Sequence, residues 1–467
     1  MMRFAALADR LAFTPSRNAK LRLMEDYFAD APDPARGWAA AALTGAIDPP
    51  GVKPAAIRAL IMERVDPELF AWSYDYVGDL AETVALLWPE GAGAADPPPL
   101  EAVVETLRAA DRAAAPAVLA DLLDRSDAVG RWALLKLATG AFRIGVSARL
   151  VKIALARHGG VDPAEVEEVW HGAEPPYADL FAWLDGAAPR PEAGDAPVFR
   201  PCMLANPLEP EDLAKLAAVD HRAEWKWDGV RVQLVAGPGG RRLYTRTGDD
   251  IGAAFPEIIE AADFAAALDG ELLIAEAEAF APEGPFGEPA PFAALQKRLN
   301  RKTVSKRLRA EAPAFLRLYD ALSIEGEDLR AFDFDRRRDR LERWFERARP
   351  ARLDLSPLIP FTDFDGLARR RADARAAGIE GLMIKRADSP YVAGRPKGAW
   401  WKWKRDPLLV DAVLMYAQRG HGRRSSFYSD FTFGCWAEVE GADRLLPVGK
   451  AYFGFTDEEL TRLDKWV

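Results

Sequence analysis

The stretch EWKWDGVR (224–231) places a lysine between two tryptophans, directly before an Asp-Gly turn. In a β-strand, Glu224, Lys226 and Asp228 would lie on one face and the two tryptophans on the other. Apolar residues move to even positions after Gly229, so the register breaks there and Lys226 lies at a strand end. Partial desolvation or a neighbouring cation lowers the pKa of a lysine, and only the neutral amine attacks phosphorus. We expect Lys226 to be a nucleophile, although K-x-D-G alone fits an ordinary strand lysine better.

Two lysines and two carboxylates elsewhere in the chain extend this chemistry. WWKWKRD (400–406) places Lys402 and Lys404 on one face of a strand, opposite two tryptophans. Adjacent ammonium groups repel unless an anion such as phosphate lies between them. Glu271 opens an apolar strand, and Glu380 lies in GIEGLMIKR. Carboxylates suit magnesium and lysines suit phosphate, so the set predicts a site for a nucleoside triphosphate with a divalent metal.

The elements that must position these residues change character along the chain. Residues 1–185 repeat apolar residues at three- and four-residue spacing, which predicts helices. Residues 186–197 are rich in Pro, Gly and Ala and predict a linker. Beyond it, alternation predicts a hairpin of 230–236 with 241–248. Further strands are expected within 268–280, 314–324, 381–386 and 399–405. A mixed α/β domain at 198–405 is therefore the predicted centre of function.

The C-terminal stretch predicts a capped helix. Thr456 and Glu459 have the spacing of a capping box, and Leu460, Leu463 and Val467 form an apolar stripe. No Gly or Pro ends this helix, and nothing follows for the stripe to pack on. We expect a truncated domain over 406–467.

Composition limits the class of protein. A chain of 467 residues should form two or three domains, and 49% hydrophobic with 29% charged residues is typical of a soluble protein. Two cysteines exclude a disulfide framework and a four-cysteine zinc site. No apolar run reaches membrane-spanning length and no signal peptide begins the chain, so a cytoplasmic location is expected.

Basic residues cluster although the net charge of −10 argues against a nucleic-acid partner. Residues 296–310 hold seven basic and no acidic side chains, and residues 385–405 hold seven against Asp388 alone. Such patches favour a polyanion. For 296–310 taken alone, solvated surface helices fit equally well.

The ordered motifs together resemble the ATP-dependent DNA ligases of the covalent nucleotidyltransferase superfamily. They are EWKWDGVR, LYTRTGDDI, LDGELL, LRLYDALSIEGEDL, IEGLMIKR and WWKWKRD. The stretch LLKLATGAFRIGVSARLVKIALA (134–156) is similar to the N-terminal DNA-binding domain of bacterial LigB-type ligases, which are associated with DNA repair. The resemblance implies a multidomain α+β protein. It would have an all-α DNA-binding domain (1–185), a linker (186–197), a mixed α/β, ATP-grasp-like nucleotidyltransferase domain (198–405) and a partial OB-fold barrel (406–467).

The resemblance also implies residue roles. Lys226 would take AMP from ATP, Glu224 would lie at the adenine, and Tyr319 would stack on it. Contacts to nucleotide or phosphate would come from Arg231, Arg246, Lys385, Arg395, Lys402 and Lys404. Glu271 would contact the ribose and the metal, and Glu380 would bind the metal. The metal would be magnesium, or manganese in its place.

The implied reaction seals nicks in duplex DNA in three steps. Lys226 takes AMP and releases pyrophosphate, AMP passes to the 5′-phosphate of a nick, and the 3′-hydroxyl displaces it. The protein would act as a monomer and bind DNA through phosphates rather than sequence. Arg143, Gly145 and Arg149 in TGAFRIGVSAR are the expected DNA contacts.

Three alternatives compete with this interpretation. No copy of the family's last basic motif, which orients pyrophosphate, precedes Val467, which favours an adenylation-impaired fragment or a DNA-binding scaffold. An RNA ligase or capping guanylyltransferase would share the lysine motif but not the helical region. A nicotinamide-dependent ligase would need a zinc-binding cysteine cluster, which two cysteines cannot supply.

Overall fold

The computed structural model describes the chain except residues 48–51, 90–97, 112, 141, 143, 193, 277–280, 282–283, 285, 374–378, 407–408, 421–427 and 453–455. The chain divides into two compact units. The first comprises Met1–Gly160, Glu174–Gly186 and Pro407–Val467, and the second Val161–Ala173 and Ala187–Asp406. In the described ranges, no helix is both long and apolar enough to cross a membrane.

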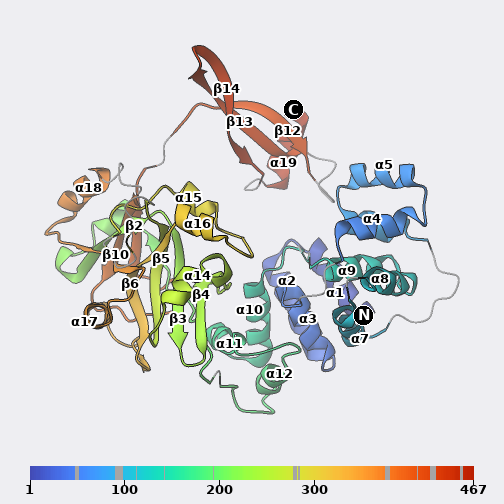
Figure 1. Cartoon of the computed structure of the whole chain (residues 1–467), viewed down its shortest axis with the longest axis horizontal. Coiled ribbons are helices and arrows are strands. Elements are labelled where there is room, and N and C mark those ends of the chain that lie inside the picture. Colours follow the sequence, from blue (N-terminus) through green and yellow to red (C-terminus); the bar gives the residue numbers. More distant parts are fainter. Residues whose placement is uncertain are drawn as a thin grey trace. The chain divides into compact units, whose positions relative to one another are not determined.

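The N-terminal region is helical, as predicted (Figure 1). Its helices are α1 (Met2–Phe13), α2 (Arg17–Asp30), α3 (Ala35–Thr44), α4 (Pro54–Met62), α5 (Pro67–Val77), α6 (Leu80–Leu87), α7 (Leu100–Ala109), α8 (Ala115–Asp124), α9 (Ala128–Ala138), α10 (Ala148–Gly159), α11 (Pro163–Trp170) and α12 (Ala178–Leu184). Polar side chains cap several of them: Ser16, Asp66, Asp79, Asp127 and Ser147 each accept a hydrogen bond from a first-turn amide. Local sequence therefore determines where these helices begin.

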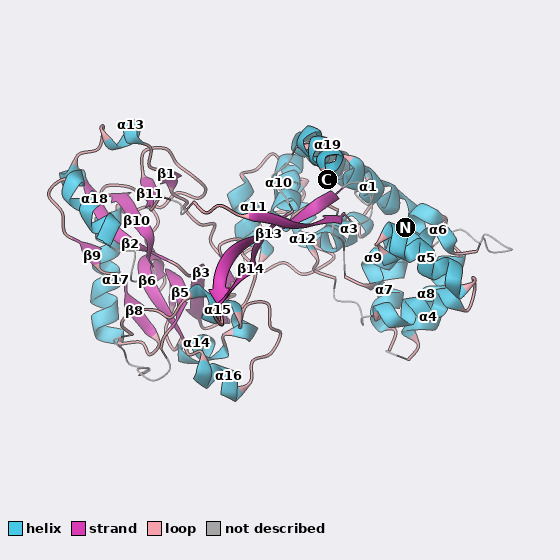
Figure 2. Ribbon diagram, turned by 90° about the horizontal axis from the view of Figure 1, so that it is seen from above, coloured by secondary structure: helices cyan, strands magenta, loops and turns pink. Residues whose placement is uncertain are grey.

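The second unit contains two sheets (Figure 2). One has the order β4-β3-β5-β6-β7, with β8 pairing β6, and the other the order β1-β11-β10-β2-β9. The first sheet contains β3 (Val230–Gly237), β4 (Gly240–Thr245), β5 (Ala266–Ile274), β6 (Ala314–Ile324), β7 (Glu327–Asp328) and β8 (Leu353–Leu355). The second contains β1 (Asn206–Pro207), β2 (His221–Trp227), β9 (Leu358–Ile359), β10 (Ile379–Arg386) and β11 (Trp400–Lys404). The predicted hairpin is confirmed, and each of the other predicted strands matches an observed one. Residues 277–280 of the strand expected within 268–280 lie outside the described residues.

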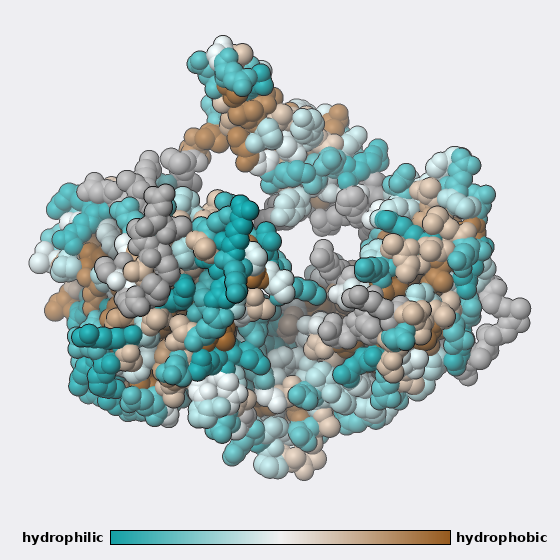
Figure 3. All heavy atoms as spheres, viewed as in Figure 1, coloured by the Kyte–Doolittle hydropathy of each residue, from teal (hydrophilic) through white to brown (hydrophobic). Residues whose placement is uncertain are grey.

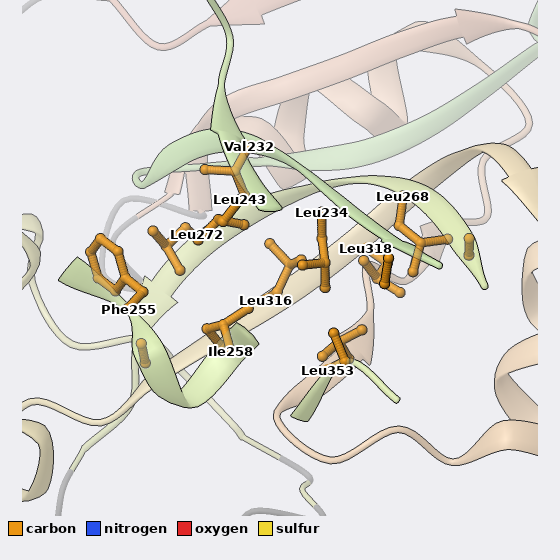
Figure 4. Close-up of a cluster of buried hydrophobic side chains, with 14 of the residues drawn as sticks. Val232, Leu234, Leu243, Phe255, Ile258, Leu268, Leu272, Leu316, Leu318 and Leu353 are labelled. Atoms are coloured by element: carbon orange, nitrogen blue, oxygen red, sulfur yellow. The ribbon is translucent and has the colours of Figure 1, made fainter. Parts of the chain in front are cut away.

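An apolar core covers one face of the β4-β3-β5-β6 sheet (Figure 4). Leu234, Leu268 and Leu318 point from neighbouring strands into it and are fully buried. Helices α14 (Pro256–Ala261) and α17 (Phe334–Ala348) add Ile258 and Trp344. Each large apolar side chain so buried contributes roughly 1.5–3 kcal/mol. This core holds β5 and β6, which carry Glu271 and Tyr319, in fixed register.

Gly381 allows β10 to approach its two neighbours. It pairs with Lys226 of β2 on one side and Lys404 of β11 on the other. Its φ is +148°, and a Cβ there would lie 2.3 Å from the carbonyl oxygen of Trp403. Only glycine fits such a position. The backbone at Gly381 therefore sets the separation of two lysine-bearing strands.

The C-terminal part forms a three-stranded antiparallel sheet followed by a helix. The elements are β12 (Val413–Arg419), β13 (Tyr428–Val439), β14 (Ala442–Ala451) and α19 (Asp457–Trp466). The capping box is confirmed, since the Thr456 amide donates to Glu459 Oε2 at 2.7 Å and the Glu459 amide to Thr456 Oγ1 at 3.2 Å. The expectation that nothing covers the stripe is wrong for Leu460, which is buried because α19 packs back on β13.

A buried ion pair anchors the segment between β5 and β6. Arg298 and Glu257 are both buried and form a two-pronged pair, with Nη2 donating to Oε2 at 2.9 Å. Arg298 also donates to the carbonyls of Ala312 (2.8 Å) and Ala254 (2.7 Å). Burial opposes ionisation of Glu257, but the hydrogen bond and charge of Arg298 lower its pKa below the usual value.

Removing this arginine should destabilise the protein. Arg298→Met removes the two-pronged partner of the buried Glu257 and leaves the more exposed Arg309 at 3.5 Å, so the free energy of unfolding should fall by about 3 kcal/mol. The matched control is Arg307→Met, which breaks an exposed pair with Glu311 and should leave the free energy of unfolding nearly unchanged. Urea unfolding followed by tryptophan fluorescence compares the two. Equal effects would mean that the buried pair is not an anchor.

Candidate active site

A pocket of 340 Å³ in the second unit collects the residues assigned from the sequence. All eleven side chains predicted for catalysis, nucleotide or metal line it: Glu224, Lys226, Arg231, Arg246, Glu271, Tyr319, Glu380, Lys385, Arg395, Lys402 and Lys404. They come from motifs far apart in the sequence, so the fold brings them together. Sequence reasoning did not assign Leu204, Ala205, Met383 and Trp400, which also line the pocket.

Lys226 faces the pocket and pairs with Glu380. Its Nζ lies 2.6 Å from Glu380 Oε2, and the two side chains are 23% and 32% exposed. Lys404 Nζ lies 3.3 Å from the same oxygen. Burial opposes ionisation of Glu380, but Lys226 and Lys404 lower its pKa below the usual value. The amine is thus held at the end of β2 while remaining accessible to a ligand.

The two tryptophans hold β2 in place. Trp227 is buried, its Nε1 donates to Ser356 Oγ at 3.0 Å, and the Arg317 guanidinium lies 4.2 Å from its ring centroid. Trp225 packs on buried residues of β10 that include Leu382. The two tryptophans that flank Lys226 in the sequence therefore fix the position of the strand that carries this lysine.

Glu224 is held by two cations. It is 1% exposed, its Oε2 lies 2.6 Å from Lys385 Nζ, and its Oε1 accepts from Arg338 Nη1 at 3.2 Å. Burial lowers the pKa of Lys385, although Glu224 opposes the shift. Lys385 is therefore engaged with Glu224 in this structure, and its assignment to phosphate stays a prediction. Arg338 lies on α17, outside every motif, so local sequence carried no signal for it.

Arg231 is oriented by partners that sequence reasoning missed. It donates to Asp269 Oδ2 and to the Met203 carbonyl, each at 2.6 Å. The Tyr391 hydroxyl donates to the same Asp269 oxygen at 2.5 Å. Asp269 is fully buried in β5. An acidic residue directly after the apolar run Ala266–Leu268 was the available signal, because a buried carboxylate needs a cationic partner.

Three carboxylates near Lys226 interact electrostatically with one another. Burial raises the pKa of Glu271 to about 8; Lys226 and Arg231 oppose this shift, and Glu380 and Asp228 add to it. Burial, and then the charge of Glu380, raises the pKa of Asp228. A metal ion relieves such repulsion. The described residues contain no cluster of three His, Cys, Asp or Glu that holds a metal. Magnesium binds through one or two carboxylates and waters, so the residues fit it.

Cations crowd around Lys402 in the pocket. Burial lowers the pKa of Lys402, and the charges of Arg395, Lys404, Lys226 and Arg246 lower it further. Crowded cations of this kind bind a polyanion favourably, because the anion removes their mutual repulsion. The predicted alternation of β11 is confirmed, since Trp401 and Trp403 pack in an apolar cluster on the opposite face.

The predicted DNA contacts lie in the helical region of the first unit. Arg143 lies outside the described residues. Gly145 has a φ of +68° and is exposed, as is Arg149 in the first turn of α10. The buried Lys20 donates to the carbonyls of Ile144 at 3.1 Å and Gly145 at 2.8 Å, which fixes this turn. The role of these residues in DNA binding stays a prediction.

Comparisons with known proteins identify relatives of the chain. The family model described as "ATP dependent DNA ligase domain" matches residues 202–404. A probable DNA ligase of Koribacter versatilis is 32% identical over 75% of this chain, which spans 62% of that protein. A probable DNA ligase of Anaeromyxobacter dehalogenans is 30% identical over 98% of this chain and 84% of its own length.

One solved structure shares the fold of almost the whole chain. Pmar-Lig_PreS3 matches with a TM-score of 0.57 over 99% of this chain and 90% of its own, at 17% identity. The chain spans about three fifths of the length of several of the curated relatives it matches, among them those of Koribacter versatilis and Natronomonas pharaonis. From the family model, the near full-length relative and the pocket, the chain belongs to the ATP-dependent DNA ligase family.

Proposed function

We propose that this protein is an ATP-dependent DNA ligase that seals nicks in duplex DNA through a Lys226–AMP intermediate. The observation that carries the proposal is the pocket in which Lys226 lies together with several lysines and arginines and the carboxylates of Glu224, Glu271 and Glu380. An amine beside a polyphosphate site is suited to phosphoryl chemistry, in which positioning and electrostatics dominate over acid–base catalysis.

In the proposed first step, Lys226 Nζ attacks the α-phosphorus of ATP. An N–P bond forms, the bond from the α-phosphorus to the bridging oxygen breaks, and pyrophosphate carries away the electron pair. The amine must lose a proton to attack, and Glu380 Oε2, at 2.6 Å, is the nearest base. Lys402, Lys404 and Arg395 would neutralise the phosphates, and Tyr319 would stack on adenine. Magnesium or manganese, held by Glu271 and Glu380, would stabilise charge on the phosphates.

In the proposed later steps, AMP passes from Lys226 to the 5′-phosphate of the nick and is then released. The 5′-phosphate oxygen of the nick displaces Lys226 and forms a P–O–P linkage. The 3′-hydroxyl then attacks the 5′-phosphorus, loses its proton, and expels AMP. Both steps again move a phosphoryl centre between oxygen or nitrogen atoms, so the cations that serve ATP also serve the adenylated nick.

We propose further that residues 1–185 bind the duplex, 186–197 link the domains, 198–405 carry adenylation and 406–467 belong to an OB-fold. Gly145 and Arg149 at the start of α10 support the first assignment, because an exposed helix N-terminus favours phosphate. The three antiparallel strands β12–β14 support the last. A cytoplasmic monomer acting in DNA repair is the proposed biological context.

A DNA-binding scaffold without catalysis is the competing function. It predicts retained binding of nicked duplex without sealing or adenylation. The joint presence of Lys226, Glu271 and Glu380 in one pocket favours the enzyme. An RNA ligase or capping guanylyltransferase is disfavoured by the helical region and by the match of nearly the whole chain to a probable DNA ligase.

Lys226→Ala should abolish sealing with ATP. The variant lacks the only proposed acceptor of AMP, so a nicked duplex with a 5′-phosphate should stay open by denaturing gel, whereas the wild-type chain joins it. A pre-adenylated nick separates the steps, because sealing there does not need the lysine as acceptor. Wild-type protein that binds the nick but seals neither substrate would favour the scaffold.

Gly381→Ala should impair adenylation without unfolding the protein. Its Cβ would lie 2.3 Å from the Trp403 carbonyl oxygen and displace β11, which carries Lys402 and Lys404. Misplacement by about 1 Å can cost about 100-fold in rate, so protein–AMP formation should fall by about that factor. Gly237→Ala, where the added Cβ meets nothing within 4 Å, is the control. Equal rates in both variants would contradict the strand-spacing argument.

A further inference from the structure

The connection between β5 and β6 carries an exposed group of basic side chains. It contains α15 (Phe292–Gln296) and α16 (Lys306–Glu311). We define the basic patch as Lys297, Arg301, Lys302 and Lys306, all of which are exposed. Figure 3 shows hydrophilic surface where these helices lie in Figure 1. The question is whether these cations are balanced by neighbouring acids.

Within the described part of the chain, no carboxylate pairs with any member of the basic patch. The neighbouring acids are already taken: Glu311 by Arg307 at 2.6 Å and Glu260 by Arg309 at 2.6 Å. Arg298, in the middle of the run, pairs inward with Glu257. Of the seven basic residues in segment 296–310, three therefore form ion pairs with carboxylates of the described chain and four do not. Solvated surface helices usually mix charges of both signs. Four exposed cations without a carboxylate partner in the described chain therefore favour binding of an external polyanion.

The β5–β6 connection leaves its sheet at the end that contacts Gly229, three residues after Lys226. Val230, three residues after Trp227, pairs with Leu272 near the end of β5, and a Cβ at Gly229 would touch Leu272 and Leu273. The β5–β6 connection starts directly after Ile274 and returns at Ala314, its partner in the ladder. Arg298 ties the connection to Glu257 and Ala254. The cations are thus anchored near the end of the β4-β3-β5-β6 sheet that contacts Gly229, three residues after Lys226.

We propose that the basic patch contacts the phosphate backbone of the nicked duplex beside the nick. This inference rests on the proposed function and assigns a DNA-contacting surface within the second unit, apart from the helical region. Lysine and arginine side chains without base-reading partners suit sequence-independent contact with phosphates. Each phosphate so neutralised releases counterions, which makes the contribution measurable as a salt dependence.

The test compares salt dependence in the full chain. The patch variant is Lys297→Gln, Arg301→Gln, Lys302→Gln and Lys306→Gln combined. The control removes the same charge on α17 through Arg336→Gln, Arg340→Gln, Arg343→Gln and Arg347→Gln, four exposed arginines that are each paired with an acid. Binding to a labelled nicked duplex is measured by fluorescence anisotropy between about 50 and about 200 mM salt. Protein–AMP formation is measured in parallel on every chain.

The patch variant should show a shallower slope of log Kd against log salt. The slope should fall by about 0.9 for each DNA phosphate that is no longer neutralised, so by at least about 2 for the four substitutions. The control should keep the wild-type slope, and all three chains should form protein–AMP at equal rates. Lys302→Gln alone should lower the slope by about 0.9, which guards against misfolding of the combined variant.

Two results would overturn the proposal in different ways. A patch variant with the slope of the wild type and control would mean that the patch does not contact DNA, and would leave the ligase assignment intact. Wild-type protein that forms no protein–AMP and does not bind nicked duplex would reject the proposed function, and the patch assignment with it.

Discussion

Repulsion between like charges around one small pocket is the constraint on which this structure depends. Lys226, Lys402 and Lys404 share 340 Å³ with several arginines, and the described chain places Glu380 between two of these lysines. Without ligand, the cations and the carboxylates of Glu271 and Asp228 each repel their own kind. A triphosphate and a divalent cation remove both repulsions together. The strands hold like charges close together against their mutual repulsion, which requires a rigid backbone. The buried core and Gly381 provide that rigidity.

Buried ion pairs fix the positions of side chains in and around the pocket. Glu224 is fixed by Arg338 and Lys385, Arg231 by Asp269, and Arg337 by Asp320. Removing one partner of such a pair leaves an uncompensated charge, so each strand is locked in register by an interaction that costs several kcal/mol to break. The same logic at Arg298 and Glu257 anchors the connection that carries the basic patch. The buried arginines stabilise the fold through their ion pairs, whereas the exposed cations of the basic patch form no such pairs within the described chain and are accessible to phosphates.

Much of the site was predictable because its motifs are local. The turn after Lys226, the alternation at Lys402 and Lys404, and the capping box at Thr456 are patterns within a few residues, and the structure confirms those elements. The partners Arg338 and Tyr391 were not predictable, since each reaches the pocket from an element more than a hundred residues from the group it orients. Leu460 was misjudged because its cover, β13, folds back from earlier in the chain. Net charge was also misleading, because it does not show which cations are paired.

The proposed activity depends on one covalent bond, between Lys226 Nζ and the phosphorus of AMP. Intact-protein mass spectrometry after incubation with ATP and magnesium, followed by peptide mapping, measures that bond directly. We predict a gain of one AMP per chain, located on the peptide that contains Lys226 and absent from Lys226→Ala. No gain in mass, or AMP on another residue, would contradict the central claim.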